Sequence, residues 1–413
     1  MARMLAGAKA PGAVTVLVLG LLTALGPLSI DLYLPAFPAL RRDLAATDGS
    51  VQLTLAGMTV GLGLGQLAVG VWSDRVGRRI PLLLSTGLHV LATVGCALAP
   101  SVAALAAFRV AQGIGAAGSS VLVLAMVRDL ADGPALVTLL SRVTLVTTAA
   151  PLVAPVAGAE LLRLVGWRGI FGVLAIGSAA VLVATAVLVP ETRRDASPPA
   201  SLLSRLRVVC SDPTFRIATV VASMTYAGVY AYVAASPMLL QEVYGFTVRG
   251  YALVFLLNSL GLVAGVQLSG LLARKTRPSR VLAGFTLTTI LAAAAIVPLQ
   301  WAHAGVAGLL ACLWVFVTGC GGCFPCAEAL ALTDQGDQSG TASSVHGFTA
   351  FTVAGLVSPL AGLVGIRNAT PVAIVLLATS ASALLSVGLL LRSSPQQGTT
   401  PARDGAHATP ERR

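Results

Sequence analysis

The stretch G-V-W-S-D-R-V-G-R-R, residues 70–79, places one aspartate and three arginines between two long apolar segments. These flanking segments, 51–72 and 80–99, are close to the roughly 20 apolar residues that a helix needs to cross a bilayer. Arginine-rich loops between membrane spans collect on the cytoplasmic side. The stretch therefore predicts two transmembrane helices joined by a short cytoplasmic loop.

The composition extends this prediction to the whole chain. Of its 413 residues, 56% are hydrophobic and 10% are charged, whereas soluble domains contain about 25% charged residues. Helices are expected, because backbone polar groups in lipid must be paired within the segment. The sequence predicts an all-α membrane protein with twelve transmembrane helices, at approximately 13–35, 51–72, 80–99, 102–126, 137–162, 168–189, 215–239, 250–273, 280–299, 305–332, 342–365 and 371–391.

The basic residues predict the orientation. With the N-terminus inside, the inner segments contain 19 Lys and Arg residues and the outer segments contain 6. This asymmetry predicts that both termini are cytoplasmic. It also accounts for the net charge of +11, so we expect a lipid bilayer around the protein and no nucleic acid partner.

Two repeated patterns divide the chain into halves. L-V-A-P-V-A-G at 152–158 recurs as L-V-S-P-L-A-G at 356–362, and Gly70 has a counterpart in Gly270. Duplicated six-span halves favour alternating access, with substrate bound between the halves near the membrane midplane. The expected organisation is a cytoplasmic N-terminus (1–12), an N-terminal six-helix bundle (13–189), a cytoplasmic linker (190–214), a C-terminal six-helix bundle (215–391) and a disordered cytoplasmic tail (392–413).

The loop at 70–79 resembles the cytoplasmic signature G-x-x-x-D-R-x-G-R-R of the major facilitator superfamily. In that family the loop acts as a latch that favours one state of the transport cycle, and a generic basic loop is the alternative interpretation. The second copy, at 270–277, has Arg274 in place of the aspartate, which predicts a weaker latch there. The resemblance implies that the latch comprises Gly70, Asp74, Arg75, Gly77, Arg78 and Arg79, with Asp129 as an acidic partner.

An arginine, Arg109, lies inside the fourth predicted span, in R-V-A-Q-G-I-G-A-A-G at 109–118. A charged side chain at the centre of a membrane helix costs about 2.5–3.5 kcal/mol on insertion scales. Such a residue is expected to face a wet cavity or a partner, and snorkelling to an interface is the alternative. Proton-coupled members of the superfamily have an arginine at this position, which implies a part in proton handling.

The fifth span contains A-A-P-L-V-A-P-V-A-G at 149–158, which resembles the antiporter motif of drug:proton exporters, here Pro151, Pro155 and Gly158. Its alanines before Pro151 are closer to the bicyclomycin/chloramphenicol-resistance branch, the Bcr/CflA type. S-I-D-L-Y-L-P-A-F-P in span 1, V-R-D-L at 127–130, G-W-R-G-I-F at 166–171, V-P-E-T at 189–192 and G-T-A-S-S-V-H-G-F at 340–348 support that branch. The resemblance implies proton-coupled efflux of small hydrophobic or amphipathic drugs across a bacterial inner membrane.

Two carboxylates within spans are candidates for proton coupling. Asp31 is the first choice, with Pro35 and Pro38 expected to end or bend the helix just beyond it. Glu328, in F-P-C-A-E-A-L-A-L at 324–332, is the second, and a place at the cytoplasmic interface near Asp334 is its alternative. Tyr33, Gln112 and Asn258 are candidate polar groups of the substrate cavity.

Other function classes have little support in the sequence. No phosphate-binding G-x-x-x-x-G-K-[ST] motif occurs, so drive by ATP is not expected. We expect no cofactor, no metal, no catalytic residues and a monomer. The remaining alternative is a proton-coupled sugar or metabolite transporter on the same fold.

Overall fold

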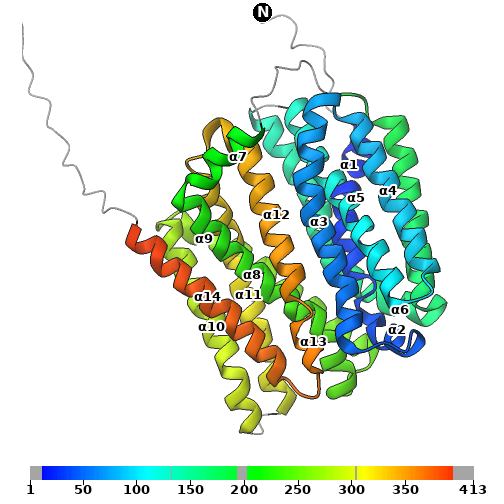
Figure 1. Cartoon of the computed structure of the whole chain (residues 1–413), viewed down its shortest axis with the longest axis vertical. Coiled ribbons are helices and arrows are strands. Elements are labelled where there is room, and N and C mark those ends of the chain that lie inside the picture. The colour runs from blue at the N-terminus through cyan, green and yellow to red at the C-terminus, as the bar shows by residue number, and fades with distance from the viewer. Residues whose placement is uncertain (1–11, 132, 193–201, 303–304, 394–413) are drawn as a thin grey trace, which may run out of the picture.

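The computed structural model describes residues 12–131, 133–192, 202–302 and 305–393. These residues are almost entirely helical and contain no strand, which confirms the predicted fold class (Figure 1). The elements are α1 (Ala13–Asp31), η1 (Leu34–Ala36), α2 (Phe37–Asp43), α3 (Asp48–Val76), α4 (Arg79–Leu98), α5 (Val102–Leu130), α6 (Gly133–Leu188), α7 (Leu202–Ser211), α8 (Pro213–Met238), η2 (Leu239–Val243), α9 (Val248–Ala273), α10 (Pro278–Trp301), α11 (Gly305–Leu332), η3 (Gly336–Gln338), α12 (Ser339–Val357), α13 (Leu360–Val364) and α14 (Thr370–Ser393).

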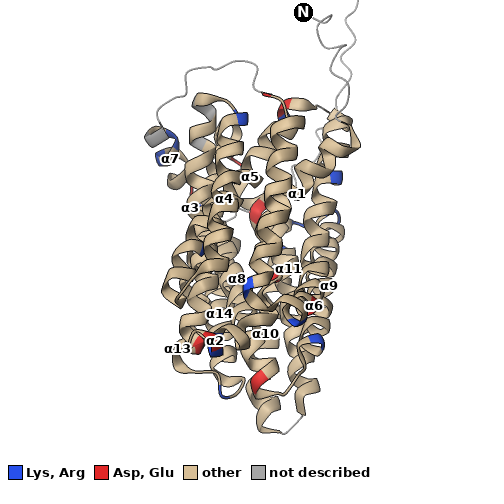
Figure 2. Cartoon of the chain, turned by 90° about the vertical axis from the view of Figure 1, so that its right-hand side faces the viewer, with Lys and Arg blue, Asp and Glu red and all other residues tan. Residues whose placement is uncertain are grey.

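The described residues contain 11 helical stretches that are long and apolar enough to cross a membrane. The longest, α6, has 56 residues, which at 1.5 Å per residue would be about 84 Å, against a hydrocarbon core of about 30 Å. Its one non-helical residue, Gly166, has a φ of 69° and a ψ of 179°. Gly166 therefore separates two spans, at the join that the sequence places between 163 and 167. Figure 2 shows long stretches of helix without charged residues.

Local sequence explains where the helices begin and break. Thr47 and Ser50 form a capping box at the start of α3, and the side chain of Ser101 accepts a hydrogen bond at the start of α5. The helix α1 ends at Asp31, and Pro35 and Pro38 lie in the first turns of η1 and α2. The expectation that the two prolines accompany a break just after Asp31 is confirmed.

Glycines bring the same pair of helices together in each half. A Cβ atom on Gly61 of α3 would lie 2.2 Å from the carbonyl oxygen of Val110 in α5. In the second half, a Cβ atom on Gly265 of α9 would lie 2.0 Å from the carbonyl oxygen of Thr318 in α11. Gly265 follows Gly61 by 204 residues (265 − 61), the same offset as the repeated heptapeptides. The close crossing of two spans is thus present twice.

The long helices define two ends of the molecule. Because α3 runs from Asp48 to Val76, its first residue and the Gly77–Arg79 loop lie at opposite ends. We call the end with Gly77 the latch end and the end with Asp48 the far end. In Figure 1 the blue and cyan helices α3, α4 and α5 lie on one side, and α10, α11 and α14 lie on the other, with α12 beside α3.

Candidate functional site

Asp31 is the last residue of α1, and its side chain faces the C-terminal half. It is 6% exposed, and within the described ranges its carboxylate has neither a hydrogen bond nor an ion pair. Tyr230 of α8 and Tyr251 of α9 lie close enough to interact with it electrostatically. The structure thus places a nearly buried carboxylate without a counter-charge where the two halves meet.

Arg109 lies on the other side of α1, inside the N-terminal half. It is fully buried, and its Nη1 donates to the carbonyl oxygen of Ser29 at 2.8 Å and to Oε1 of Gln112 at 2.6 Å. Its guanidinium carbon is 4.3 Å from the centre of the Tyr33 ring. Burial excludes the snorkelling alternative in this conformation. Ser29 is in the last turn of α1, where a cation is favoured by the helix dipole.

Arg109 and Asp31 are therefore not brought into direct contact. Among the described residues, no ion pair joins the guanidinium of Arg109 to a carboxylate. The nearest link between the two is the backbone of α1, from the carbonyl of Ser29 to Asp31 two residues later. The Ser29 contact is therefore a structural link between Arg109 and the helix end that carries Asp31.

The predicted cavity residues Tyr33 and Gln112 belong to the interior of the N-terminal half. The Tyr33 hydroxyl is 2.8 Å from Oγ1 of Thr54, and its ring lies 5.4 Å from that of Phe171. Nε2 of Gln112 donates to Oγ1 of Thr93 at 2.8 Å. In this conformation their polar groups hold Arg109 and the neighbouring helices, and their assignment to a substrate cavity stays a prediction.

Asn258 is likewise a packing residue, in the C-terminal half. Its Nδ2 donates to the Tyr232 hydroxyl at 3.0 Å and to the carbonyl oxygen of Val254 at 2.9 Å. The side chain is 3% exposed. The structure therefore does not place it on an open cavity surface, although its Oδ1 has no hydrogen-bond partner among the described residues.

Glu328 lies one turn before the end of α11, toward the latch end, and is exposed. The groups that act on it electrostatically are Arg128 of α5 and Tyr226 of α8. These two residues come from opposite halves. Asp31 acts electrostatically on Tyr230, and Glu328 acts on Tyr226, one turn earlier on α8.

Four aromatic rings that pack together in the C-terminal half were not predicted as site residues from the sequence. Tyr226 and Tyr230 of α8 are one helical turn apart, and Phe324 of α11 and Phe351 of α12 pack against them. All four side chains are partly exposed. We call them the aromatic cluster. The available signal was T-Y-A-G-V-Y in span 7, where two tyrosines at i and i+4 share one helix face.

At the latch end, Arg78 bridges parts of the N-terminal half. Its Nε is 3.5 Å from Oδ2 of Asp129, and its Nη1 donates to Oγ of Ser73 at 2.6 Å. Gly77 has a φ of 95°, which favours glycine. Asp129 is thus the partner of an arginine of this loop. Asp74 and Arg75 lie within α3, but their side chains are outside the described part of the chain.

Glu191 completes this loop and was missed as a site residue by sequence reasoning. Its carboxylate accepts hydrogen bonds from the backbone N–H groups of Arg78 at 2.9 Å and Arg79 at 3.0 Å. An anion is favoured at this place, because these N–H groups begin α4. Nη2 of Arg79 donates to the carbonyl oxygen of Ala186 at 2.6 Å. The loop is therefore tied to the end of α6.

Gly70 of the predicted latch and Gly158 of the predicted antiporter motif both lie against other helices or loops. A Cβ atom on Gly70 would lie 3.5 Å from Oγ of Ser344 in α12, which belongs to the other half. A Cβ atom on Gly158 would lie 2.0 Å from the carbonyl oxygen of Leu32. Pro151 and Pro155 lie inside the same helix, α6. The predicted antiporter motif thus packs against the break that follows Asp31.

The far end is sealed by contacts between the halves. Arg41 forms ion pairs with Asp48 and with Glu242 of the other half, and Glu160 pairs with Arg249 at 2.5 Å. Gln52 donates to the carbonyl oxygen of Ala234 at 3.2 Å and accepts from the N–H of Gly362 at 3.0 Å. Gln241 donates to the carbonyl oxygen of Pro35 at 3.2 Å. Five hydrogen bonds between the halves, including those of Gln52 and Gln241, lie toward this end.

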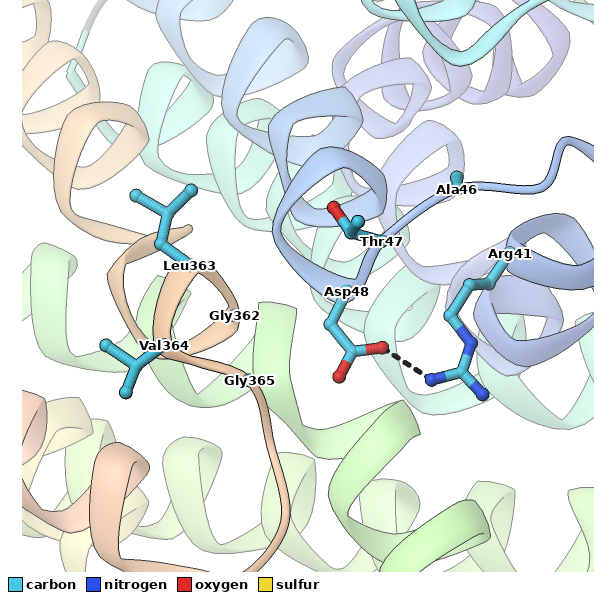
Figure 3. A pocket seen from close by; sticks show the side chains of 8 residues that line it. All are labelled: Arg41, Ala46, Thr47, Asp48, Gly362, Leu363, Val364 and Gly365. Carbon is cyan, nitrogen blue, oxygen red and sulfur yellow. Dashed lines mark hydrogen bonds and ion pairs between the residues drawn. The ribbon is translucent and has the colours of Figure 1, made fainter.

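A small surface cavity of about 400 Å³ lies within this seal. Figure 3 shows Arg41 and Asp48 facing each other on one side of it and Leu363 and Val364 on the other. The lining residues are Arg41, Ala46, Thr47, Asp48, Gly362, Leu363, Val364 and Gly365. The cavity marks where the N-terminal half meets the α13–α14 connection.

Comparison with known proteins agrees with this architecture. The family described as the Major Facilitator Superfamily matches residues 19–359. An uncharacterized MFS-type transporter, YdgK of Bacillus subtilis, is 32% identical over 84% of this chain and 88% of its own. A chloramphenicol resistance protein of Pseudomonas aeruginosa is 29% identical over 94% of this chain and 92% of its own.

A solved structure shows the same fold. The D-xylose-proton symporter superposes with a TM-score of 0.72 over 92% of this chain and 98% of its own, at 15% sequence identity. At this identity the likeness concerns the fold alone. The relative named for chloramphenicol resistance confirms the resemblance to the drug:proton antiporter type that the sequence motifs indicate.

Proposed function

The chain belongs to the major facilitator superfamily of membrane transporters, and from this membership we propose that it exports small hydrophobic or amphipathic drugs in exchange for protons. The name of the chloramphenicol resistance relative supports the drug as cargo. We place the protein in a bacterial inner membrane with the latch end and both termini in the cytoplasm. Chloramphenicol-like compounds are the first candidates for substrate.

The observation that carries this proposal is the environment of Asp31. Its carboxylate is almost buried, faces the other half and has no cation or donor partner among the described residues. Burial without compensation disfavours a permanent charge. A group in that position can take a proton in one state and release it when water or a ligand arrives, which is the property that an antiporter needs.

The seal at the far end supports a place in the transport cycle. With the latch end in the cytoplasm, the contacts of Arg41 with Glu242 and of Glu160 with Arg249 close the outer side. These contacts support an inward-facing conformation in this orientation, and Glu328 lies on the cytoplasmic side of Asp31 in this proposal. In this proposal the drug enters the protein from the cytoplasm. The contacts at the far end then break in the outward-facing state, and a proton enters the cell by binding to Asp31.

The break after Asp31 offers a way to couple the proton to this movement. Arg109 holds the carbonyl of Ser29 on one side of α1, and Gly158 touches the carbonyl of Leu32 on the other. A change in the charge of Asp31 acts on the α1 end that these contacts hold. Helix α6 also packs on α9 of the other half, so a shift of the α1 end can reach the interface.

The test uses inside-out membrane vesicles that carry the full-length chain. Addition of chloramphenicol to energised vesicles should release protons, detected as recovery of the fluorescence of a pH-gradient dye. Asp31→Asn should abolish this recovery, Asp31→Glu should retain part of it, and Asp334→Asn should leave it unchanged, at equal amounts of inserted protein.

The result that would overturn the assignment is undiminished proton release by Asp31→Asn. Accumulation in whole cells separates the function classes. Less chloramphenicol in cells that express the protein, restored by a protonophore, supports export. Greater accumulation on expression would instead indicate uptake, the activity of a symporter.

A further inference from the structure

We propose that the C-terminal half binds the headgroup of an anionic phospholipid at its latch end, on a surface formed by Arg274, Lys275, Arg277, Arg280 and Arg392. We call these five residues the basic rim. The proposal concerns the lipid around the protein and does not depend on the exported compound. Three observations carry it: the cations have no acidic partner, the N-terminal half differs at the same place, and exposed apolar side chains lie directly beside the cations.

The basic rim lies at the latch end of neighbouring helices. Helices α9 and α14 both begin at the far end, α9 at the ion pair of Arg249 and α14 after α13, which lines the cavity there. Their last residues and the start of α10 therefore lie at the latch end, where they carry Arg274, Arg277, Arg280 and Arg392. Because α10 and α14 pack together in one apolar cluster, Arg280 and Arg392 lie at the same end of adjacent helices. Figure 1 shows the red end of α14 on the side of the molecule away from α3, α4 and α5.

The cations of the basic rim have no acidic partner. All five side chains are exposed, and among the described residues none of them forms an ion pair. Asp212, an acid at the start of α8 in the same half, is instead held by Nε2 of Gln335 at 2.7 Å. Like charges on one short surface repel one another. An anion shared between them therefore lowers their electrostatic energy.

The same place in the N-terminal half contains acids. Asp129 pairs there with Arg78 at 3.5 Å. Glu191, just beyond the end of α6, accepts hydrogen bonds from the backbone N–H groups of Arg78 and Arg79 at the start of α4. In the C-terminal half the end of α14 carries Arg392, and in the described residues no side chain caps the start of α10. The second half thus has the cations of this loop without the carboxylate, so a phosphate group can take the part that Glu191 has in the first half.

Apolar side chains beside the basic rim favour a lipid over a free anion. Leu271 and Leu272 lie within three residues of Arg274 at the end of α9, and both are exposed. Leu389, also exposed, lies three residues before Arg392 on α14. At 1.5 Å per residue, these leucines and cations are less than about 5 Å apart along each helix axis. A phospholipid can place its phosphate on the cations and its acyl chains on the leucines, whereas inorganic phosphate or an acidic protein segment contacts the cations alone.

Lipid binding to the purified, delipidated full-length protein tests the proposal. The protein is mixed in neutral detergent with equal amounts of phosphatidylglycerol and phosphatidylcholine of the same acyl chains, and native mass spectrometry counts the lipids that stay bound. The parent protein should retain phosphatidylglycerol about tenfold more than phosphatidylcholine. Arg277→Gln, Arg280→Gln and Arg392→Gln should each lower this preference about two- to fivefold, and the triple variant should bring it close to one.

Two further triple variants separate the site from net charge and from misfolding. Arg142→Gln, Arg163→Gln and Arg367→Gln together remove three exposed cations elsewhere, and this variant should keep the preference of the parent within about twofold. Lysine at positions 277, 280 and 392 keeps the charges, and this variant should also keep most of the preference. High salt should reduce the preference of the parent, because screening weakens exposed charges.

Three results would overturn the proposal. The parent protein could retain both lipids equally, or the control triple variant could lose the preference as fully as the variant of the basic rim. Inorganic phosphate or polyglutamate could also displace phosphatidylglycerol at equal concentration, which would identify a free anion or an acidic protein segment as the occupant. The measurement uses neither a gradient nor a drug, so each of these results leaves the proposed export function standing.

Discussion

Gly158 packs directly against the backbone of Leu32: a Cβ atom on the glycine would lie 2.0 Å from the carbonyl oxygen. Leu32 is the residue after Asp31, where α1 ends. The motif on α6 and the carboxylate on α1 are thus neighbours through the backbone, without contact between their functional groups. This relationship explains why a small residue is needed at that point of α6.

The first prediction follows from this contact. Gly158→Ala should reduce drug-driven proton release at least tenfold, because the methyl group must displace backbone rather than a flexible side chain. Gly172→Ala, in the second span of α6, is the matched control, because a Cβ atom there meets nothing within 4 Å. Vesicles with equal protein content give the comparison. Full activity of Gly158→Ala would show that the α1 end tolerates the displacement.

The second prediction concerns the seal at the far end. Arg41→Gln removes the ion pairs with Asp48 and Glu242. Only the pair with Glu242 joins the two halves. Because an exposed or partly exposed pair is worth about 0.2–1 kcal/mol, the population with an open far end should rise by up to about fivefold. Spin labels at Ala46 and Val364, on opposite sides of the seal, should report a larger share of long distances.

A control variant and salt dependence sharpen this test. Arg163→Gln, at a more exposed arginine of the same end, should leave the distance distribution unchanged, because its acidic partner Glu160 also pairs with Arg249. High salt should move the parent protein toward the Arg41→Gln distribution, since screening weakens exposed pairs. A distance distribution that neither Arg41→Gln nor high salt changes would show that Arg41 does not contribute to the seal.

The third prediction concerns Glu191. Glu191→Ala should lower the free energy of unfolding by about 1 kcal/mol, because two N–H groups at the start of α4 lose their acceptor. It should also change the rate of transport, since the latch loop is no longer tied to the end of α6. Thermal unfolding in detergent measures the first effect. Asp334→Ala, at an exposed acid of the latch end, is the control. An unchanged melting temperature would mean that water replaces the carboxylate.

The sequence predicted those features that depend on pattern along the chain. Apolar length located the spans, Gly166 fell at the expected join, and the prolines after Asp31 marked the helix break. The acidic partner of the latch loop was also found, because Asp129 ends the helix next to it. These features depend on residues that are close together in the sequence, so the sequence pattern alone can predict them.

The sequence pattern does not predict which face of each helix packs against which neighbouring helix. Tyr33 and Gln112 are polar groups in apolar spans, the same signal that a cavity residue gives, yet they are satisfied inside one bundle. Tyr226 and Tyr230 give that signal too, and their hydroxyls are left open. Glu191 was missed because its partners are backbone groups more than 110 residues away in sequence.

The last prediction separates two ways in which Arg109 can serve Asp31. Arg109 binds Ser29 and Gln112, not the carboxylate, so a double-mutant cycle of Arg109→Gln and Asp31→Asn should show a coupling in unfolding free energy below about 0.5 kcal/mol. Arg109→Gln alone should destabilise by about 1–3 kcal/mol, because the buried carbonyl of Ser29 loses its donor. Arg142→Gln, at an exposed arginine of α6, should be nearly neutral. A coupling of several kcal/mol in detergent would contradict this prediction and show that Arg109 and Asp31 depend on each other for stability.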